Sequence, residues 1–340
     1  LCKSTLLAVA ATLSSLLLLE RPSQSQDWFT TGINLGAPRI RLAVADFPPK
    51  TADQQLTSLT QEFNQTLWND LDNAGIFEMV SKSLHPLKVP QEPEEVVFAN
   101  WAEPPATAQM LAFGKTEVLN ANLVVTARLF DVKNPPNPSV IAKRYVATMN
   151  QVATREAAHR FANEIIQALG GGVPGINLTR IAFVSKRTGH PEIWVMDYDG
   201  FNQRPITSYG SQALTPRWSA DNTKLAFTSY SLGNPDLFVF SLETNRRTPF
   251  PRYKGLNTTP AWSPDGKKIA FCSSMSGDPE IYVSDVNGFN QQRLTFSPGV
   301  DISPVWNPKT GNEIAFVSDR SGSPQIYIMS ADGTNVRRLI

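Results

Sequence analysis

The sequence predicts two folds in succession, an α/β domain followed by an all-β propeller. The propeller prediction comes from a block of about 44 residues that occurs four times in the second half of the chain. Ala-Phe recurs at 182–183, 226–227, 270–271 and 315–316, and Pro-x-Trp begins three of the copies. A fixed period of short strands and turns is typical of propeller blades. Residues 39–170 lack this period and contain amphipathic helical patterns instead.

The length, net charge and cysteine content of the chain limit its possible organisation and partners. A length of 340 residues suits two domains. Lys and Arg number 31 against 30 Asp and Glu, so the formal net charge of +1 gives no reason to expect nucleic acid as a partner. Cys2 lies in a segment that we expect to be removed, which leaves Cys272 without a disulfide partner.

The N-terminus has the pattern of a secretory signal peptide, predicted at 1–25. Lys3 precedes an apolar stretch at 6–19, and small residues follow at 23–25. The apolar stretch is short for a membrane span, although an uncleaved anchor is the alternative. Export of a cysteine-poor chain points to a bacterial periplasm, with no membrane insertion after the signal is removed. We expect a mature N-terminal segment at 26–38.

Residues 39–170 predict an α/β domain with the order β-α-β-α-β-β-α. Apolar residues at steps of three and four mark the first and last helices, and a proline-rich loop at 86–105 precedes a short helix. We expect the helices on one face of a mixed sheet, with a glycine-rich linker at 171–177. The expected strands are 39–45, 76–81, 122–130 and 140–148. The expected helices are 56–71, 106–113 and 158–169.

The third copy of the repeat shows how one blade is built. Ser263-Pro264-Asp265-Gly266 suits a β-turn, and Asn287-Gly288 suits a tight hairpin because both residues tolerate positive φ. Four antiparallel strands result, at 259–262, 268–273, 280–285 and 292–295. The first copy begins at Arg180 and lacks the Pro-x-Trp strand, which ring closure takes from the other end of the chain. The propeller is expected over 178–340.

Two motifs resemble ligand sites but lack the required pattern. Gly114-Lys115-Thr116 resembles the end of a phosphate-binding loop, yet the glycine needed five residues earlier is Gln109. Residues 197–202 and 285–290 resemble calcium loops, but their ligands are too few, and the same hairpin in successive blades explains Asn/Asp-Gly.

Other candidates for chemistry are equally weak. The histidines have no metal-ligand spacing, and Gly-x-Ser-x-Gly does not occur. We predict no catalytic, cofactor or metal site, and we expect the blade tryptophans to pack rather than to stack on a ligand. The histidines are His85, His159 and His190.

The blade sequence resembles the propeller repeat of the TolB family, part of the Tol–Pal system of Gram-negative bacteria. The resemblance is carried by Pro-Ala-Trp-Ser-Pro-Asp-Gly-Lys-Lys-Ile-Ala-Phe at 260–271, with Ile-Tyr-Val at 281–283 and Arg-Leu-Thr at 293–295. Residues 180–184 followed by 196–203 are similar to the first blade of that family. The order of signal, α/β domain, linker and propeller also agrees over essentially the whole chain.

The resemblance implies a six-bladed propeller, of which about four blades are present here. Six blades need roughly 264 residues, and 163 remain from position 178 to 340. Leu1 is not an initiator methionine, and Ile340 falls inside a repeat. We therefore expect a part of a longer chain whose blades form an open arc.

The resemblance also implies a function, that of a non-enzymatic, monomeric periplasmic adaptor without cofactors. In the family the propeller rim binds the peptidoglycan-associated lipoprotein Pal, and the mature N-terminal segment contacts TolA. The system maintains the outer membrane and supports its constriction during cell division. The implied TolA-facing residues are Gln26, Asp27, Trp28 and Phe29. The implied Pal-facing residues, in the loops that enter each Pro-x-Trp strand, are Ser211, Gln212, Leu214, Tyr253, Lys254, Asn257, Thr258, Val300, Asp301 and Ile302.

Two alternatives remain open at this point. One is an exported propeller-bearing peptidase of the prolyl-oligopeptidase type, with its catalytic domain missing from this chain. The other is a propeller that binds a sugar or another small molecule in its channel. An α/β domain between signal and propeller favours the adaptor. The rim loops can also be ordinary surface loops.

Overall fold

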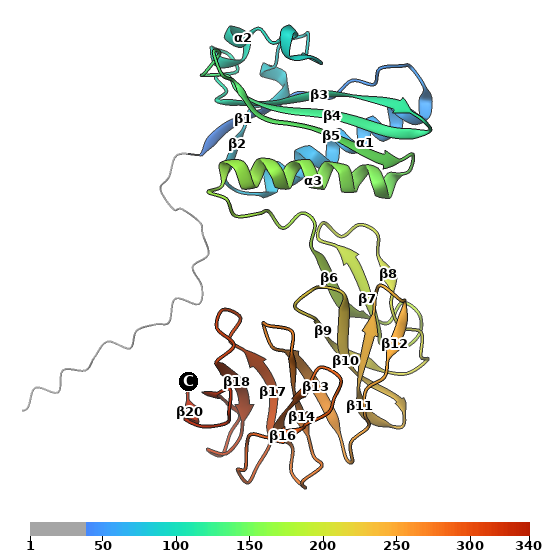
Figure 1. Ribbon diagram of the computed structural model, residues 1–340, viewed down its shortest axis with the longest axis vertical. Helices are drawn as coiled ribbons and strands as arrows, with labels where there is room; N and C mark the ends of the chain where they lie inside the picture. The colour runs from blue at the N-terminus through green and yellow to red at the C-terminus, as the bar shows by residue number, and fades with distance from the viewer. Residues whose placement is uncertain (1–38) are drawn as a thin grey trace, which may run out of the picture.

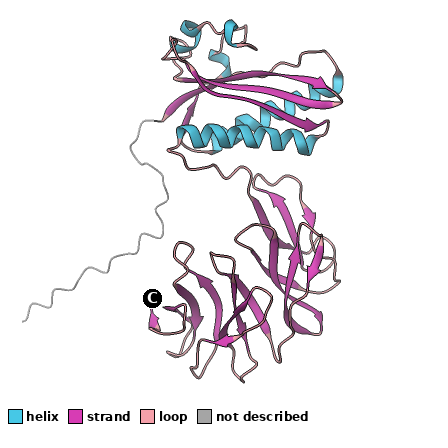
Figure 2. Cartoon of the chain, in the orientation of Figure 1, coloured by secondary structure: helices cyan, strands magenta, loops and turns pink. Residues whose placement is uncertain are grey.

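The structure is a computed structural model that describes residues 39–340. The predicted signal peptide at 1–25 and the segment 26–38 lie outside the described residues. Figure 2 shows that the α-helices lie in the first part of the chain, together with a sheet, whereas the second part contains strands joined by loops. The predicted fold class, an α/β domain followed by propeller blades, is confirmed.

The first part is a five-stranded mixed sheet in the order β2-β1-β3-β4-β5. Strand β1 is parallel to both β2 and β3, and the remaining pairs are antiparallel. Helices α1 and α3 cover one face of the sheet, as predicted, and bury Phe63 and Phe161 against it. The elements are β1 Ile40–Val44, α1 Gln54–Asn73, β2 Phe77–Met79, the 3₁₀ turns Lys82–Leu84 and Pro93–Glu95, α2 Phe98–Ala102, β3 Met110–Leu119, β4 Asn122–Asp131, β5 Ser139–Thr148 and α3 Gln151–Leu169.

Both long helices begin at a side-chain cap. Asp53 accepts a hydrogen bond from the main-chain N–H of Leu56 at 2.7 Å, and Asn150 accepts one from Ala153 at 2.9 Å. Each cap satisfies an N–H group that the first helical turn leaves without a partner. The two caps therefore mark where α1 and α3 begin.

The segment predicted as a short helix at 106–113 is instead a turn and loop at 106–109 followed by the first four residues of β3. The prediction was wrong because this strand lies between β1 and β4 and is buried on both faces, so its sequence shows no alternation of apolar and polar residues. The preceding proline-rich segment packs on the face opposite to α1 and α3, where Trp101 joins Phe113 and Phe130 in a second core.

The second part consists of four consecutive sheets, one of three strands and three of four. Figure 1 shows them side by side in an open arc. The first blade contains β6 Arg180–Ser185, β7 Glu192–Asp197 and β8 Arg204–Pro205. The second contains β9 Ala213–Trp218, β10 Lys224–Leu232, β11 Asn234–Ser241 and β12 Arg246–Thr248. The third contains β13 Asn257–Trp262, β14 Lys268–Ser273, β15 Glu280–Asp285 and β16 Gln292–Arg293. The fourth contains β17 Asp301–Trp306, β18 Glu313–Ser318, β19 Gln325–Ser330 and β20 Arg337–Arg338.

The Pro-x-Trp tryptophans join each blade to the one before it. The indole N–H of Trp262 donates to the carbonyl of Arg217 at 3.1 Å, and Trp306 repeats this bond to Ala261 at 3.1 Å. Trp218 has no such acceptor among the described residues, because the first blade has no strand equivalent to β9. The predicted packing role of these tryptophans is confirmed.

The Asp/Asn-Gly motifs form the hairpin turns that were predicted for them. Gly200 and Gly288 adopt φ of +84° and +83°. The N–H of each glycine donates to the main-chain carbonyl of the aspartate three residues earlier, Asp197 or Asp285. Turn geometry therefore accounts for both copies of the motif.

Candidate functional site

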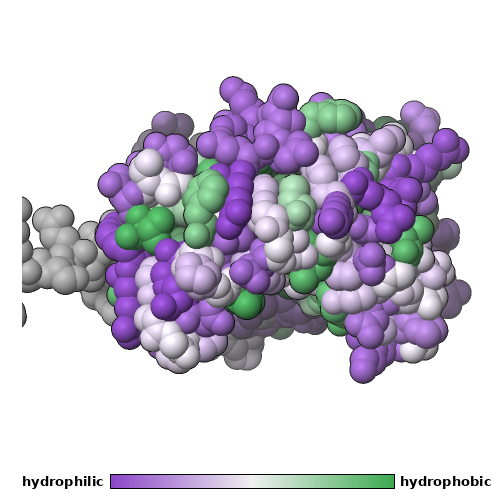
Figure 3. Space-filling view, turned by 90° about the horizontal axis from the view of Figure 1, so that it is seen from below, coloured by the Kyte–Doolittle hydropathy of each residue, from purple (hydrophilic) through white to green (hydrophobic). Residues whose placement is uncertain are grey.

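The three predicted rim loops lie at one end of the inner strands, immediately before β9, β13 and β17. These strands form one edge of their sheets, and β13 packs against both β9 and β17. Successive loops therefore come together along one rim of the arc. Figure 3 views the propeller from the side away from the α/β domain, where the surface is largely hydrophilic with separate hydrophobic patches.

The predicted rim residues differ in how much of them a partner can reach. Gln212 and Lys254 are exposed, and Val300 is 37% exposed. Asn257 and Asp301 are buried at the starts of β13 and β17. The other predicted residues are partly buried, namely Ser211, Leu214, Tyr253, Thr258 and Ile302.

The two buried residues have partners within the blades. The Asp301 carboxylate is 1% exposed and accepts a hydrogen bond from Arg320 Nη2 at 2.7 Å. Asn257 donates from Nδ2 to the carbonyl of Tyr253 at 3.0 Å and accepts from Ser273 Oγ at 2.7 Å. Both residues hold their loops in shape, so the exposed residues among those predicted for the rim are Gln212, Lys254 and Val300.

One exposed aromatic residue of this rim was not predicted. Phe296 is 72% exposed in the loop between β16 and β17, and the guanidinium of Arg293 lies 4.6 Å from the centre of its ring. The residues predicted for this loop began four positions later, at Val300. An aromatic residue directly after the outer strand was the available signal.

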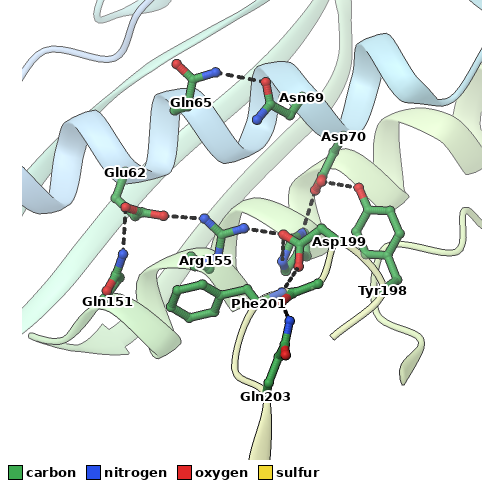
Figure 4. A network of polar contacts seen from close by, with 12 residues as sticks. Glu62, Gln65, Asn69, Asp70, Gln151, Arg155, Tyr198, Asp199, Phe201 and Gln203 are labelled. Carbon is green, nitrogen blue, oxygen red and sulfur yellow. Dashed lines mark hydrogen bonds and ion pairs between the residues drawn. The ribbon is translucent and has the colours of Figure 1, made fainter. Parts of the chain in front are cut away.

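A second polar site joins the α/β domain to the first blade (Figure 4). Arg155 on α3 forms ion pairs with Glu62 on α1 and with Asp199 in the turn after β7. The hydroxyl of Tyr198, in the same turn, donates to Asp70 on α1. The network therefore links two helices of one domain to one hairpin of the other.

Burial shapes the chemistry of this network. Burial raises the pKa of Tyr198 well above its ordinary value, and the hydrogen bond to Asp70 adds to the effect, so Tyr198 stays a neutral donor. Burial opposes the charge of Arg155, but its bonds to Glu62 and Asp199 outweigh burial and raise its pKa. Burial, together with the neighbouring Asp199, raises the pKa of Asp197.

Sequence reasoning missed this interface, although the repeats contained a signal. The turn 197–202 and its counterpart 285–290 have the same backbone, but Tyr198 and Asp199 replace Val286 and Asn287. Both residues that differ between the copies contact the α/β domain, as does the shared Phe201, whose ring centre lies 4.3 Å from the Arg155 guanidinium. Side chains that depart from a repeat whose backbone is unchanged indicate a contact outside the repeat.

The rim and the α/β domain lie at opposite ends of the blades. Strand β7 ends at the turn that contacts α1 and α3. Strand β8 runs back antiparallel to β7, and the chain then enters the first rim loop. The N–H of Ala213, at the start of β9, donates to the carbonyl of Pro191 just before β7. The rim is therefore not covered by the α/β domain.

Other predicted features concern metals, membranes and the N-terminal segment. Within residues 39–340 no three His, Cys, Asp or Glu side chains gather as metal ligands. In the same range no helix has the length and apolar character needed to cross a bilayer. The predicted TolA-facing residues lie outside the described residues; they are Gln26, Asp27, Trp28 and Phe29.

The architecture defines a class, that of two-domain propeller proteins in which an α/β domain is fixed to one blade and a loop-lined rim is left open. Models of two protein families match the chain. The TolB amino-terminal domain matches residues 33–137, and the TolB beta propeller domain matches residues 169–340. The chain belongs to the TolB family.

Individual relatives agree with this assignment. The Tol-Pal system protein TolB of Nitrosospira multiformis is 35% identical over 189 residues, which is 55% of this chain and 40% of the relative. That of Geobacter metallireducens is 37% identical over 195 residues, covering 57% of this chain and 44% of the relative. The crystal structure of TolB from Acinetobacter baumannii matches with a TM-score of 0.71 and 27% identity, over 89% of this chain and 71% of that one. The chain thus spans less than half the length of these curated relatives. The family assignment confirms the predicted resemblance and speaks against the peptidase alternative.

Proposed function

We propose that this protein is a periplasmic adaptor of the Tol–Pal system that binds the lipoprotein Pal at its rim and TolA through its N-terminal segment. The adaptor would help maintain the outer membrane and its constriction during division. The observation that carries the proposal is the rim itself, since three successive loops present side chains at the end of the blades remote from the α/β domain.

The composition of the rim supports a protein partner. Lys254, Val300 and Phe296 combine a cation with exposed apolar side chains. Interfaces commonly have such a mixture, with an aromatic anchor and a polar border. The proposed site comprises all three loops, with Asn257 and Asp301 supporting the exposed residues rather than making the contact.

A charge reversal at the rim tests the Pal contact. We expect Lys254→Glu to weaken binding of the soluble domain of Pal roughly three- to tenfold, mainly through slower association, because a border charge acts by steering. Lys309→Glu is the matched control, since Lys309 is exposed in the turn between β17 and β18, at the opposite end of the inner strand. Biolayer interferometry with immobilised Pal measures both. Equal affinity for wild type and Lys254→Glu would place the contact elsewhere.

The TolA contact has a separate test. It is assigned to Gln26, Asp27, Trp28 and Phe29, within the proposed division of signal peptide 1–25, mature segment 26–38, α/β domain 39–170, linker 171–177 and propeller 178–340. Replacing Trp28 and Phe29 by alanine should abolish capture by TolA and leave binding to Pal unchanged, because the two sites use different residues. Retained capture by TolA contradicts this part of the proposal.

A further inference from the structure

His159 is buried between the two domains with only one of its nitrogens hydrogen-bonded. Its Nδ1 lies 2.6 Å from Asp70 Oδ2. A carboxylate can only accept, so the proton of this bond belongs to Nδ1. Within residues 39–340 its Nε2 is buried without a hydrogen-bond partner, and the nearest charged oxygen in that range, Asp199 Oδ2, is 3.7 Å away across the domain boundary.

In neutral His159, two electron-rich atoms therefore face each other. Nε2 presents a lone pair, and so does the Asp199 carboxylate. A buried polar atom without a partner destabilises the arrangement that contains it. A proton on Nε2 turns this contact into a charge-assisted hydrogen bond between the domains, once the atoms approach by less than 1 Å.

The charged surroundings of His159 come from every element that packs around it. Asp70 and Glu62 belong to α1, and Arg155, Glu156 and Arg160 belong to α3. The first blade contributes Arg180, Asp197, Tyr198 and Asp199. Arg155 already neutralises part of the charge of Glu62 and Asp199, and Arg160 pairs with Glu156. Among the described residues, the hydrogen-bond donors to the Asp70 carboxylate are Tyr198 and His159 alone, and neither carries a charge when His159 is neutral. A positive His159 would therefore be the cation that balances Asp70.

Solvent reaches the edge of this contact. A polar cavity of about 410 Å³ lies between α3 and the first blade, and its walls include His159, Asp197 and Arg180. The imidazole of His159 therefore borders a space that is open to solvent.

We propose that protonation of His159 acts as a clamp that holds the α/β domain to the first blade. The proton binds more strongly to the closed arrangement, because only there does Nε2 have an acceptor. Closure is therefore favoured at acid pH and weakens as pH rises. The device concerns the domain interface alone and does not depend on which partner binds the rim.

The test measures the distance between the domains in the full chain as a function of pH. Spin labels are placed at Asn137→Cys, in the exposed loop after β4, and at Lys309→Cys, in the fourth blade, with Cys2→Ser to remove a competing thiol. Pulsed electron spin resonance gives the distance distribution between pH 5.5 and 8. We expect the ratio of closed to open molecules to fall roughly tenfold over this range, the equivalent of one charge-assisted hydrogen bond.

Matched variants identify the groups involved. Asp199→Asn removes the acceptor charge and should abolish the pH response, as should His159→Gln, which cannot titrate. Asp197→Asn lies two residues away in the same turn and should keep the response. Far-UV circular dichroism checks the fold of each variant. An unchanged distance distribution in the wild type, a normal response in Asp199→Asn, or a response lost in Asp197→Asn would each overturn the proposal.

A measurement on protein in which His159 and Asp199 are unchanged keeps the proposal testable if a variant fails to fold. In protein with ¹⁵N-labelled histidine, the Nε2 resonance of His159 should change from an acceptor to a donor signal at the same pH at which the distance changes. If His159 titrates without any change in the distance between the domains, its role is that of a buried structural histidine and the proposal is wrong.

Discussion

The indole N–H of Trp306 donates to the main-chain carbonyl of Ala261 in the preceding blade, at 3.1 Å. The same bond from Trp262 reaches Arg217. Trp218 occupies the equivalent place but has no acceptor among the described residues, and the guanidinium of Arg180 lies 5.1 Å from the centre of its ring. A comparison of the three tryptophans therefore distinguishes the stabilisation that comes from the hydrogen bond from the stabilisation that comes from packing of the ring.

Trp306→Phe should lower the free energy of unfolding by about 1–3 kcal/mol more than Trp218→Phe does. The first substitution removes a buried hydrogen bond as well as part of a ring, and the second removes a buried donor that is already unpaired. Unfolding in urea, followed by circular dichroism, measures both. Equal losses of unfolding free energy would show that packing of the ring, and not the hydrogen bond between blades, determines how much these tryptophans stabilise the protein.

Cys272 should resist thiol reagents in the folded protein. Burial raises the pKa of its thiol from the ordinary value of 9.0 to about 11. At pH 8 little thiolate is present, and the sulfur is covered by the blade. We expect Ellman's reagent to react with Cys272 only as fast as the molecule unfolds, in a Cys2→Ser background. Rapid labelling under native conditions contradicts this.

Ionisation of the same thiol should lower the stability of the folded protein at high pH. A pKa raised by folding means that ionisation is easier in the unfolded chain, so the stabilisation is complete below pH 9 and is lost as pH rises toward 11. The contribution is of the order of 2 kcal/mol. Cys272→Ala should flatten the fall in unfolding free energy between pH 9 and 11, relative to the wild type, whatever it does to stability at neutral pH.

Gly114→Ala should prevent proper folding of the α/β domain. A Cβ at this position would lie 1.9 Å from the carbonyl oxygen of Thr126 on β4 and 2.6 Å from the ring of Phe47. Backbone on one side and a buried ring on the other leave no room, so we expect a loss of more than about 3 kcal/mol. Gly75→Ala is the control, because its Cβ would meet nothing within 4 Å. At φ +71° its cost should be about 1 kcal/mol. Similar melting temperatures for the two variants contradict the expectation.

Reversing the charge of Asp301 should damage the propeller itself. Asp301→Lys replaces a buried carboxylate by a second cation beside Arg320 and should cost about 3–5 kcal/mol. Lys254→Glu, on the exposed part of the same rim, should change stability by less than about 0.5 kcal/mol. Thermal unfolding compares them. A stable Asp301→Lys variant would mean that the carboxylate is not needed at the start of β17.

The periodic features of this fold could be predicted from the sequence, and the contacts between distant residues could not. The blades follow from a repeat of about 44 residues, and α1 follows from leucines at helical spacing, since both patterns are local. Strand β3 was mistaken in part for a helix because burial on both faces removes the alternation that distinguishes a strand.

The candidate sites show the same division. The rim loops could be located because each precedes a recognisable Pro-x-Trp strand. That Asp301 is buried and Lys254 exposed depends on Arg320, which lies in a different loop of the blade. The network of Arg155, Tyr198 and Asp199 joins segments more than 40 residues apart, and only the comparison between copies of the turn hinted at it.

The opposed placement of rim and α/β domain has a mechanical consequence. A blade strand of six residues such as β7 spans roughly 20 Å, so molecules seated at the two ends need not touch one another. Two tethers anchored in different layers of a cell envelope could pull on this protein at the same moment, and the tension would pass lengthwise along the strands of the first blade.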